Sequence, residues 1–170
     1  LLETQLKRAK AAARLLKNMP TCTKNQALDK IADALIAHSD EILEANKKDM
    51  AHAKEVNMTK AMQDRLLFTH ERIVGVSEGV KKVATLPDPI GEVMESWTRA
   101  NGLKISKVRV PIGVFGIIYE ARPNVTVDIA SLCLKSGNAC VLRGGKEAIH
   151  TNKKLVEIMK DATKDILPEG

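Results

Sequence analysis

A nearly continuous apolar run, VPIGVFGIIY at residues 110–119, constrains the fold more than any other feature of the sequence. Such a run predicts a β-strand buried on both faces. The pattern after it predicts a helix at 126–135, a stop at 136–138, a strand at 139–143 and a helix at 146–167. Two strands joined by one crossover helix lie parallel, with a right-handed connection. The sequence therefore predicts an α/β fold whose last part is the βαβα beginning of a Rossmann-like sheet.

The first half of the chain is predicted to be helical. Apolar side chains recur at helical spacing over residues 2–86. Thr23 and Gln26 have the spacing of a capping box, so a second helix is expected to begin after Thr23. Ser39, followed by two acids, is expected to cap a third helix, and a further helix is expected after Thr69.

A β-hairpin is predicted between the two halves. The stretch LPDPIG at 86–91 contains two prolines and a glycine, which end the helical pattern. Residues 93–98 and 103–110 alternate in character, and Asn101-Gly102 between them is typical of a two-residue hairpin turn.

Composition and cysteine usage exclude several classes of protein. No apolar run approaches the roughly 20 residues of a membrane span, and the first ten residues lack a signal-peptide core, so we expect a cytoplasmic protein that does not enter membranes. Cys22, Cys133 and Cys140 form neither a CxxC pair nor a cluster with histidines. We therefore expect reduced thiols and no metal site.

The positive charge of the chain does not by itself predict nucleic-acid binding. Lysine and arginine outnumber aspartate and glutamate by 27 to 21, giving a formal net charge of +6. Only 2% of the residues are aromatic, and the basic residues are scattered, so base-stacking platforms are missing. A nucleic-acid-binding module is the least favoured of the functions considered.

Two strand-to-helix turns carry the candidate functional residues, because α/β proteins bind ligands where parallel strands end. The first turn contains Arg122 and Asn124. Asn124 either caps the next helix or offers its amide to a developing oxyanion or to the substrate. The second turn is Arg143-Gly144-Gly145-Lys146, where the glycines are either structural or let a phosphate approach the backbone between two cations.

Residues 110–148, VPIGVFGIIYEARPNVTVDIASLCLKSGNACVLRGGKEA, resemble gamma-glutamyl phosphate reductases, a branch of the aldehyde dehydrogenase superfamily. The motifs IADAL, ILEANKKD, AMQDRLLFT and LPDPIGEV match upstream in the same order, so the resemblance covers nearly the whole chain. It implies NADPH-dependent reduction of L-glutamate 5-phosphate to L-glutamate 5-semialdehyde, with release of phosphate, in proline biosynthesis. It also implies a homo-oligomer.

The resemblance assigns three parts to the chain. Residues 1–90 are expected to be the helical part of the cofactor-binding domain, 91–109 a bridging hairpin, and 110–170 the start of the NADP-binding unit. Two parallel strands protect their edges poorly, so we expect the sheet to continue beyond residue 170. The catalytic domain, with the cysteine that attacks the acyl carbon in this superfamily, is expected there as well.

The resemblance also suggests roles for individual residues. Arg143 and Lys146, on either side of the glycines, are expected near the adenosine ribose, where Lys146 would meet the 2′-phosphate of NADPH. Lys146 alternatively only begins a solvent-facing helix. Arg122 is expected to meet the phosphate or carboxylate of the substrate, and Asn124 to be the oxyanion or substrate contact. Cys133 and Cys140 are expected to pack rather than react.

A non-catalytic role competes with the enzyme interpretation. In that alternative the helices and the hairpin at Asn101-Gly102 serve assembly or interaction, as related hairpins do in aldehyde dehydrogenase oligomers.

Overall fold

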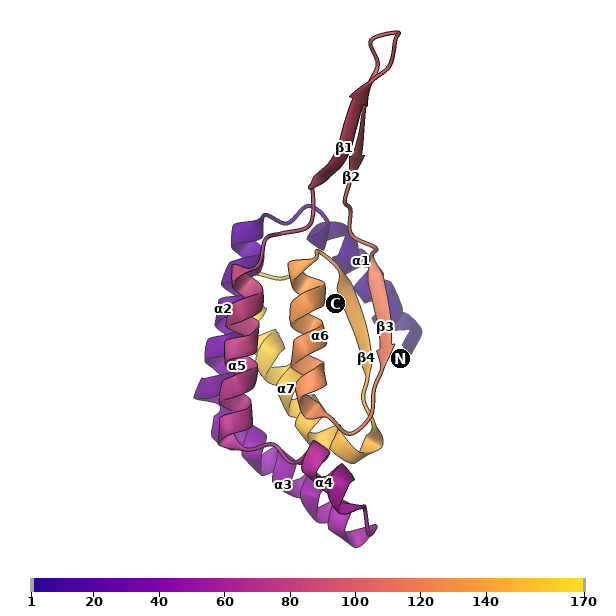
Figure 1. Cartoon of the computed structure of the whole chain (residues 1–170). Helices are drawn as coiled ribbons and strands as arrows, with labels where there is room; N and C mark the ends of the chain where they lie inside the picture. The colour runs from indigo at the N-terminus through magenta and orange to yellow at the C-terminus, as the bar shows by residue number, and fades with distance from the viewer. Residues whose placement is uncertain (1, 170) are drawn as a thin grey trace.

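The computed structural model describes residues 2–169 and has the predicted α/β class (Figure 1). Its helices are α1 (Leu2–Leu16), α2 (Thr21–Ala37), α3 (Ser39–Glu55), α4 (Lys60–Leu66), α5 (His70–Thr85), α6 (Pro123–Lys135) and α7 (Ile149–Thr163), with a short 3₁₀ turn at Lys146–Ala148. Its strands are β1 (Val93–Thr98), β2 (Lys104–Val108), β3 (Val114–Ile118) and β4 (Ala139–Arg143). The β1–β2 hairpin projects as an arm from a body made of the helices and the β3–β4 pair.

Strands β3 and β4 are parallel, as predicted, with registers running from Val114 opposite Ala139 to Ile118 opposite Arg143. The expectation that residues 110–119 are buried on both faces is wrong. Ile112 is 78% exposed and Ile118 82% exposed. Regular pairing starts only at Val114, and β4 is the one strand that pairs with β3 within residues 2–169, so the rest of the run lacks a covering layer.

The hairpin is confirmed, but its predicted two-residue turn is wrong. The N–H of Gly102 donates to the Arg99 carbonyl at 2.9 Å, and the N–H of Arg99 donates to the Leu103 carbonyl at 2.9 Å. Only Gly102 in this loop has a positive φ, of 84°. The Asn101 side chain accepts from the Leu103 N–H at 3.2 Å, which suits a three-residue loop closed by a glycine.

Two predicted helix starts are corrected by the structure. Helix α2 begins at Thr21, directly after Pro20, so the capping box of Thr23 and Gln26 does not form. Proline already supplies the backbone angles of the cap position. His38 rather than Ser39 occupies the N-cap position of α3, without a side-chain capping hydrogen bond, and the first turn carries two acids as expected. The Thr69 side chain accepts from the Arg72 N–H, which confirms the predicted start of α5.

The last two helices also differ in their bounds. Helix α6 begins at Pro123, three residues before the predicted start, since proline fits the first helical position. The predicted helix at 146–167 is divided into the 3₁₀ turn and α7, which ends at Thr163.

One apolar cluster joins the helices to the β3–β4 pair. It contains Leu28, Leu35, Ile42, Val127 and Leu155, which are all at most 1% exposed. Helix α2 contacts α5, α6 and α7, while α1 and α6 both contact β4. Within residues 2–169, none of the helices is both long and apolar enough to cross a bilayer.

A buried ion pair fastens the root of the arm to the body. The Lys24 ammonium, only 2% exposed, pairs with the Asp88 carboxylate in the proline-containing connection before β1. Burial alone would raise the pKa of Asp88, but hydrogen bonds from Lys24, Thr21 and the Ile90 N–H outweigh it and hold that pKa below its usual range. Charged pairs of this kind are costly to break from one side, so the arm is fixed at its base.

One turn of α3 holds two distant segments in place. The Asp49 carboxylate accepts from the N–H groups of His150 and Thr151, at 3.1 and 2.8 Å, and from the Thr151 hydroxyl at 2.6 Å. Asn46 donates to the Leu66 carbonyl at 2.9 Å and accepts from the Phe68 N–H at 2.9 Å. Asp49 thus caps the start of α7, and Asn46 fixes the connection between α4 and α5.

We predict that Asp49→Ala destabilises the fold by about 2 kcal/mol, because it removes a charged cap and leaves buried donors without a partner. Urea unfolding followed by circular dichroism measures this change. Asp161→Ala, at an exposed position on α7, is the matched control and should stay within about 0.5 kcal/mol of the parent chain. Equal midpoints for the two variants would contradict the anchoring role of Asp49.

Candidate functional site

The two predicted turns lie side by side at the carboxyl ends of the parallel strands. The Tyr119 N–H donates to the Arg143 carbonyl at 3.1 Å, just past the last paired residues. A Cβ added to Gly145 would lie 3.4 Å from the carbonyl carbon of Glu120. The structure therefore brings together the segments that the sequence analysis selected separately, at the edge where α/β proteins bind ligands.

A chain of side-chain hydrogen bonds packs against the second turn. The Tyr119 hydroxyl lies 2.5 Å from the Thr126 hydroxyl, which donates to the Asn152 side-chain oxygen at 2.9 Å. Because Thr126 uses its proton for Asn152, Tyr119 is the donor to Thr126. Burial raises the pKa of Tyr119, so the phenol keeps its proton. The chain ties β3, α6 and α7 together under the glycines.

Gly144 is required by this packing. A Cβ there would lie 2.3 Å from the Asn152 side-chain nitrogen and 3.1 Å from the Tyr119 hydroxyl. The protein's own side chains therefore occupy the space that the missing side chain leaves.

The Glu147 carboxylate packs over Gly145. A Cβ on Gly145 would lie 2.1 Å from Glu147 Oε2. That oxygen is buried and has no hydrogen-bond partner among residues 2–169. Buried polar atoms are normally paired, so Glu147 Oε2 is an exception among the described residues.

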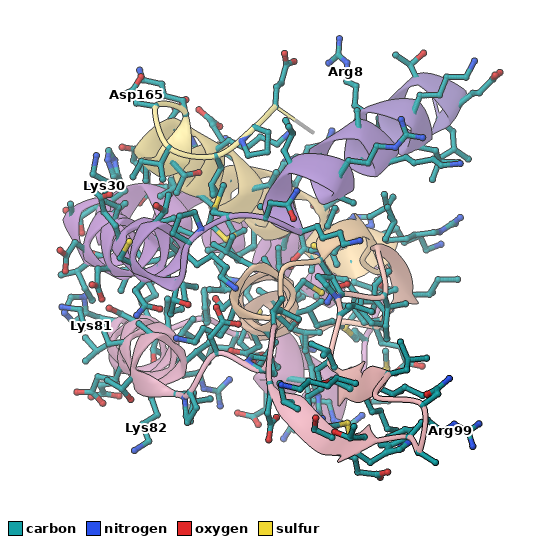
Figure 2. The ribbon with its side chains drawn as sticks, turned by 90° about the horizontal axis from the view of Figure 1, so that it is seen from above. Arg8, Lys30, Lys81, Lys82, Arg99 and Asp165 are labelled. Atoms are coloured by element: carbon teal, nitrogen blue, oxygen red, sulfur yellow. The ribbon has the colours of Figure 1, made fainter. Side chains whose placement is uncertain are left out.

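Arg143 and Lys146 are exposed on either side of the glycines. Within the described part of the chain neither side chain makes an ion pair or hydrogen bond. Basic residues elsewhere, such as Lys30 on α2, Lys81 and Lys82 on α5 and Arg99 in the hairpin loop, lie at the periphery (Figure 2). The cations beside the glycine turn thus differ from the others by their position at the strand ends.

A pocket of about 470 Å³ lies beside the first turn, between the α4–α5 segment and the start of α6. Arg122 and Asn124 line it, whereas residues 143–146 do not. The volume falls in the range of about 300 to 1,000 Å³ typical of small-molecule sites. The predicted substrate residues and the predicted cofactor residues therefore face separate spaces.

The proposed helix cap at Asn124 is wrong. Arg122 occupies the cap position and Pro123 the first helical position of α6. The Asn124 amide instead donates to Asp128 Oδ2 at 3.0 Å, one helical turn further along. Its predicted contact with an oxyanion or with the substrate stays a prediction.

The arginines around the pocket differ in how they are engaged. Arg72 donates to the carbonyls of Asp64 and Leu67 and forms an ion pair with the Asp64 carboxylate at 2.9 Å. Arg65 and Arg122 also line the pocket, and within residues 2–169 their guanidinium groups make no hydrogen bond or ion pair. These two groups are available to an anion.

The three cysteines are free. Cys133 is 7% exposed in α6. The neighbouring Cys133 thiol and burial raise the pKa of Cys140 well above its usual range. A raised pKa disfavours the thiolate, so Cys140 is a poor nucleophile. Within residues 2–169, no group of three or more His, Cys, Asp or Glu side chains is arranged to hold a metal ion.

Asp128, Asn152 and Glu147 were not predicted from the sequence. Asn124 and Asp128 are four residues apart on α6, so helical spacing alone indicated their contact. The positions of Asn152 and Glu147 beside the glycines depend on the boundary between the 3₁₀ turn and α7. No local sequence pattern predicted that boundary.

The parallel pair, the crossover helix and the glycine turn at the strand ends form a Rossmann-like α/β unit. The aldehyde dehydrogenase family model matches residues 2–170, so the chain belongs to the aldehyde dehydrogenase family. A probable aldehyde dehydrogenase from Listeria monocytogenes shares this fold, with a TM-score of 0.72 at 17% identity over 98% of this chain and 34% of that one.

More similar relatives are gamma-glutamyl phosphate reductases. The protein of that name from Clostridium novyi is 55% identical over 95% of this chain and 39% of its own length. The crystal structure of the Thermotoga maritima reductase has a TM-score of 0.96 at 43% identity, over 99% of this chain and 41% of that chain. The chain thus spans about 40% of the length of these relatives.

We predict that Gly144→Ala destabilises the fold by about 1 to 3 kcal/mol, because its Cβ would displace Asn152 from the polar chain. Gly79→Ala is the matched control, since a Cβ there meets nothing within 4 Å and alanine favours the helix. Denaturant unfolding should show opposite shifts for the two variants. A Gly144→Ala chain as stable as the parent would mean that the turn has room for a side chain.

Proposed function

We propose that this chain is part of an NADPH-dependent oxidoreductase that reduces L-glutamate 5-phosphate to L-glutamate 5-semialdehyde in cytoplasmic proline biosynthesis. The observation that carries the proposal is the exposed pair Arg143 and Lys146 at the carboxyl ends of the parallel strands, in a chain 55% identical to the Clostridium novyi reductase. The proposed partners are the phosphorylated substrate and further copies of the same chain, without nucleic acid or membrane.

The second turn fits the adenosine end of a phosphorylated dinucleotide. Arg143 and Lys146 offer two unengaged cations to the 2′-phosphate. Gly144 lets Asn152 of α7 pack close to the turn. When bound, the nicotinamide would supply the hydride for reduction.

The first turn fits the substrate side. Arg122 is the candidate partner for a phosphate or carboxylate, and Asn124 for the oxyanion or another substrate atom. A nucleophilic thiol must be both ionisable and accessible, but Cys133 is buried and Cys140 has a raised pKa. Cys22 is exposed but lies in the first turn of α2, outside both strand-to-helix turns. The acyl-transfer cysteine is therefore proposed to lie outside residues 1–170.

A second candidate function is assembly through the arm. Its exposed apolar side chains include Val93, Trp97 and Leu103, at 56%, 46% and 57% exposed. Apolar groups on a projecting hairpin favour association with another protein surface. This role is compatible with the enzyme function in a homo-oligomer.

We predict that the purified 170-residue chain does not oxidise NADPH in the presence of L-glutamate 5-phosphate, because neither Cys133 nor Cys140, the cysteines beside the candidate site, is suited to attack the acyl carbon. Nicotinamide absorbance at 340 nm measures turnover. Turnover that is lost in a Cys133→Ser variant would show that the packing assignment of Cys133 is wrong.

We predict that Lys146→Glu, in the natural enzyme that contains this chain, weakens NADPH binding roughly 10- to 100-fold and changes NADH binding little. The substitution removes a charged hydrogen bond and adds repulsion against the 2′-phosphate. Lys160→Glu, exposed near the other end of α7, makes the same charge change away from the turn and should not alter the ratio of kcat/KM for the two cofactors. An unchanged ratio in Lys146→Glu would mean that Lys146 only begins a solvent-facing turn.

A further inference from the structure

The pocket beside the first turn has a specific balance of charge. Five charged residues line it: Asp64, Arg65, Arg72, Arg122 and Asp128. Asp64 and Arg72 neutralise each other at 2.9 Å. Two guanidinium groups and one carboxylate remain for a ligand.

Asp128 is the carboxylate that remains. It lines the pocket, and Oδ2 accepts from the Asn124 amide at 3.0 Å. Within residues 2–169 its other oxygen has no partner and no lysine or arginine pairs with it. Partial desolvation raises the pKa of Asp128, while the Asn124 hydrogen bond opposes that rise. A cation brought by a ligand would compensate this charge.

The two remaining guanidinium groups are those of Arg65, on α4, and Arg122, at the start of α6. Asp128 is also on α6, whereas Arg65 reaches the pocket from α4, so charges line the cavity from two elements. Guanidinium groups bind carboxylate and phosphate in a planar, two-pronged geometry.

We propose that this pocket binds an α-amino acid that carries a second acidic group, with Asp128 accepting its ammonium and Arg65 and Arg122 pairing with its two anionic ends. This assignment rests on the proposed function, whose substrate has one ammonium, one carboxylate and one phosphate. Asn124 positions Asp128 through their hydrogen bond, so it acts as a positioning residue for ammonium recognition.

The test compares L-glutamate with glutarate, which lacks only the ammonium, as ligands of the natural protein that contains this chain. Asp128→Asn should weaken L-glutamate binding roughly 10- to 100-fold in calorimetry and leave glutarate binding within about 2-fold. Asp161→Asn, at an exposed position on α7, should change neither. No binding of L-glutamate to the parent protein, or an equal effect of Asp128→Asn on both ligands, would overturn the proposal.

A steric variant checks the location independently of charge. Gly75 lines the pocket on α5, and Gly79 lies one turn further along the same helix outside it. Added Cβ atoms meet nothing within 4 Å at either position. Gly75→Met should weaken L-glutamate binding at least about 10-fold, whereas Gly79→Met should not. Equal affinities in the two variants would place the ligand elsewhere.

Turnover separates this proposal from the proposed function. A parent protein that distinguishes L-glutamate from glutarate through Asp128, but does not reduce L-glutamate 5-phosphate with NADPH, would refute the function and leave the pocket assignment intact. A protein that performs the reduction while Asp128→Asn leaves ammonium recognition unchanged would refute the pocket assignment alone.

Discussion

Both halves of the candidate site depend on one buried turn of α3. Asp49 caps the start of α7, which packs beneath the glycine turn, and Asn46 binds both backbone ends of the connection between α4 and α5. That connection forms one wall of the pocket. The hydrogen bonds that the buried Asp49 carboxylate accepts, and those that the buried Asn46 amide makes, are directional, so they fix position as well as contribute stability. Asn46 and Asp49 of the motif ILEANKKD thus fix the positions of two segments that are distant in sequence.

The glycine turn combines a packed inner side with an open outer side. Gly144 meets Asn152 and Tyr119, so its small size serves the protein's own packing. A nucleotide would therefore approach from the side of Arg143 and Lys146, where the side chains are exposed. A packing role for the glycines is compatible with phosphate binding at the turn. Gly144 packs against Asn152 and Tyr119 on one side, and the Arg143 and Lys146 side chains stay exposed.

Periodicity predicted the helical half, the hairpin and the parallel pair, because those elements follow from local patterns of two and 3.6 residues. Local patterns predicted the cap at Thr69 correctly and the capping box at Thr23 wrongly, since Pro20 already supplied the backbone angles there. The two turns were selected from their place after strands. The roles of Asn46 and Asn152 follow only from tertiary contacts, which a single sequence does not display.

In the proposed enzyme, the second turn receives the adenosine 2′-phosphate of NADPH while the neighbouring pocket stays available to the substrate. A crystal structure of the natural protein that contains this chain, determined with bound NADPH, tests the claim most directly. We expect the 2′-phosphate within about 3 Å of the Lys146 ammonium or the Arg143 guanidinium, with no part of the nucleotide against Asp128. A 2′-phosphate held by other residues, or a nucleotide lying in the Asp128 pocket, would contradict it.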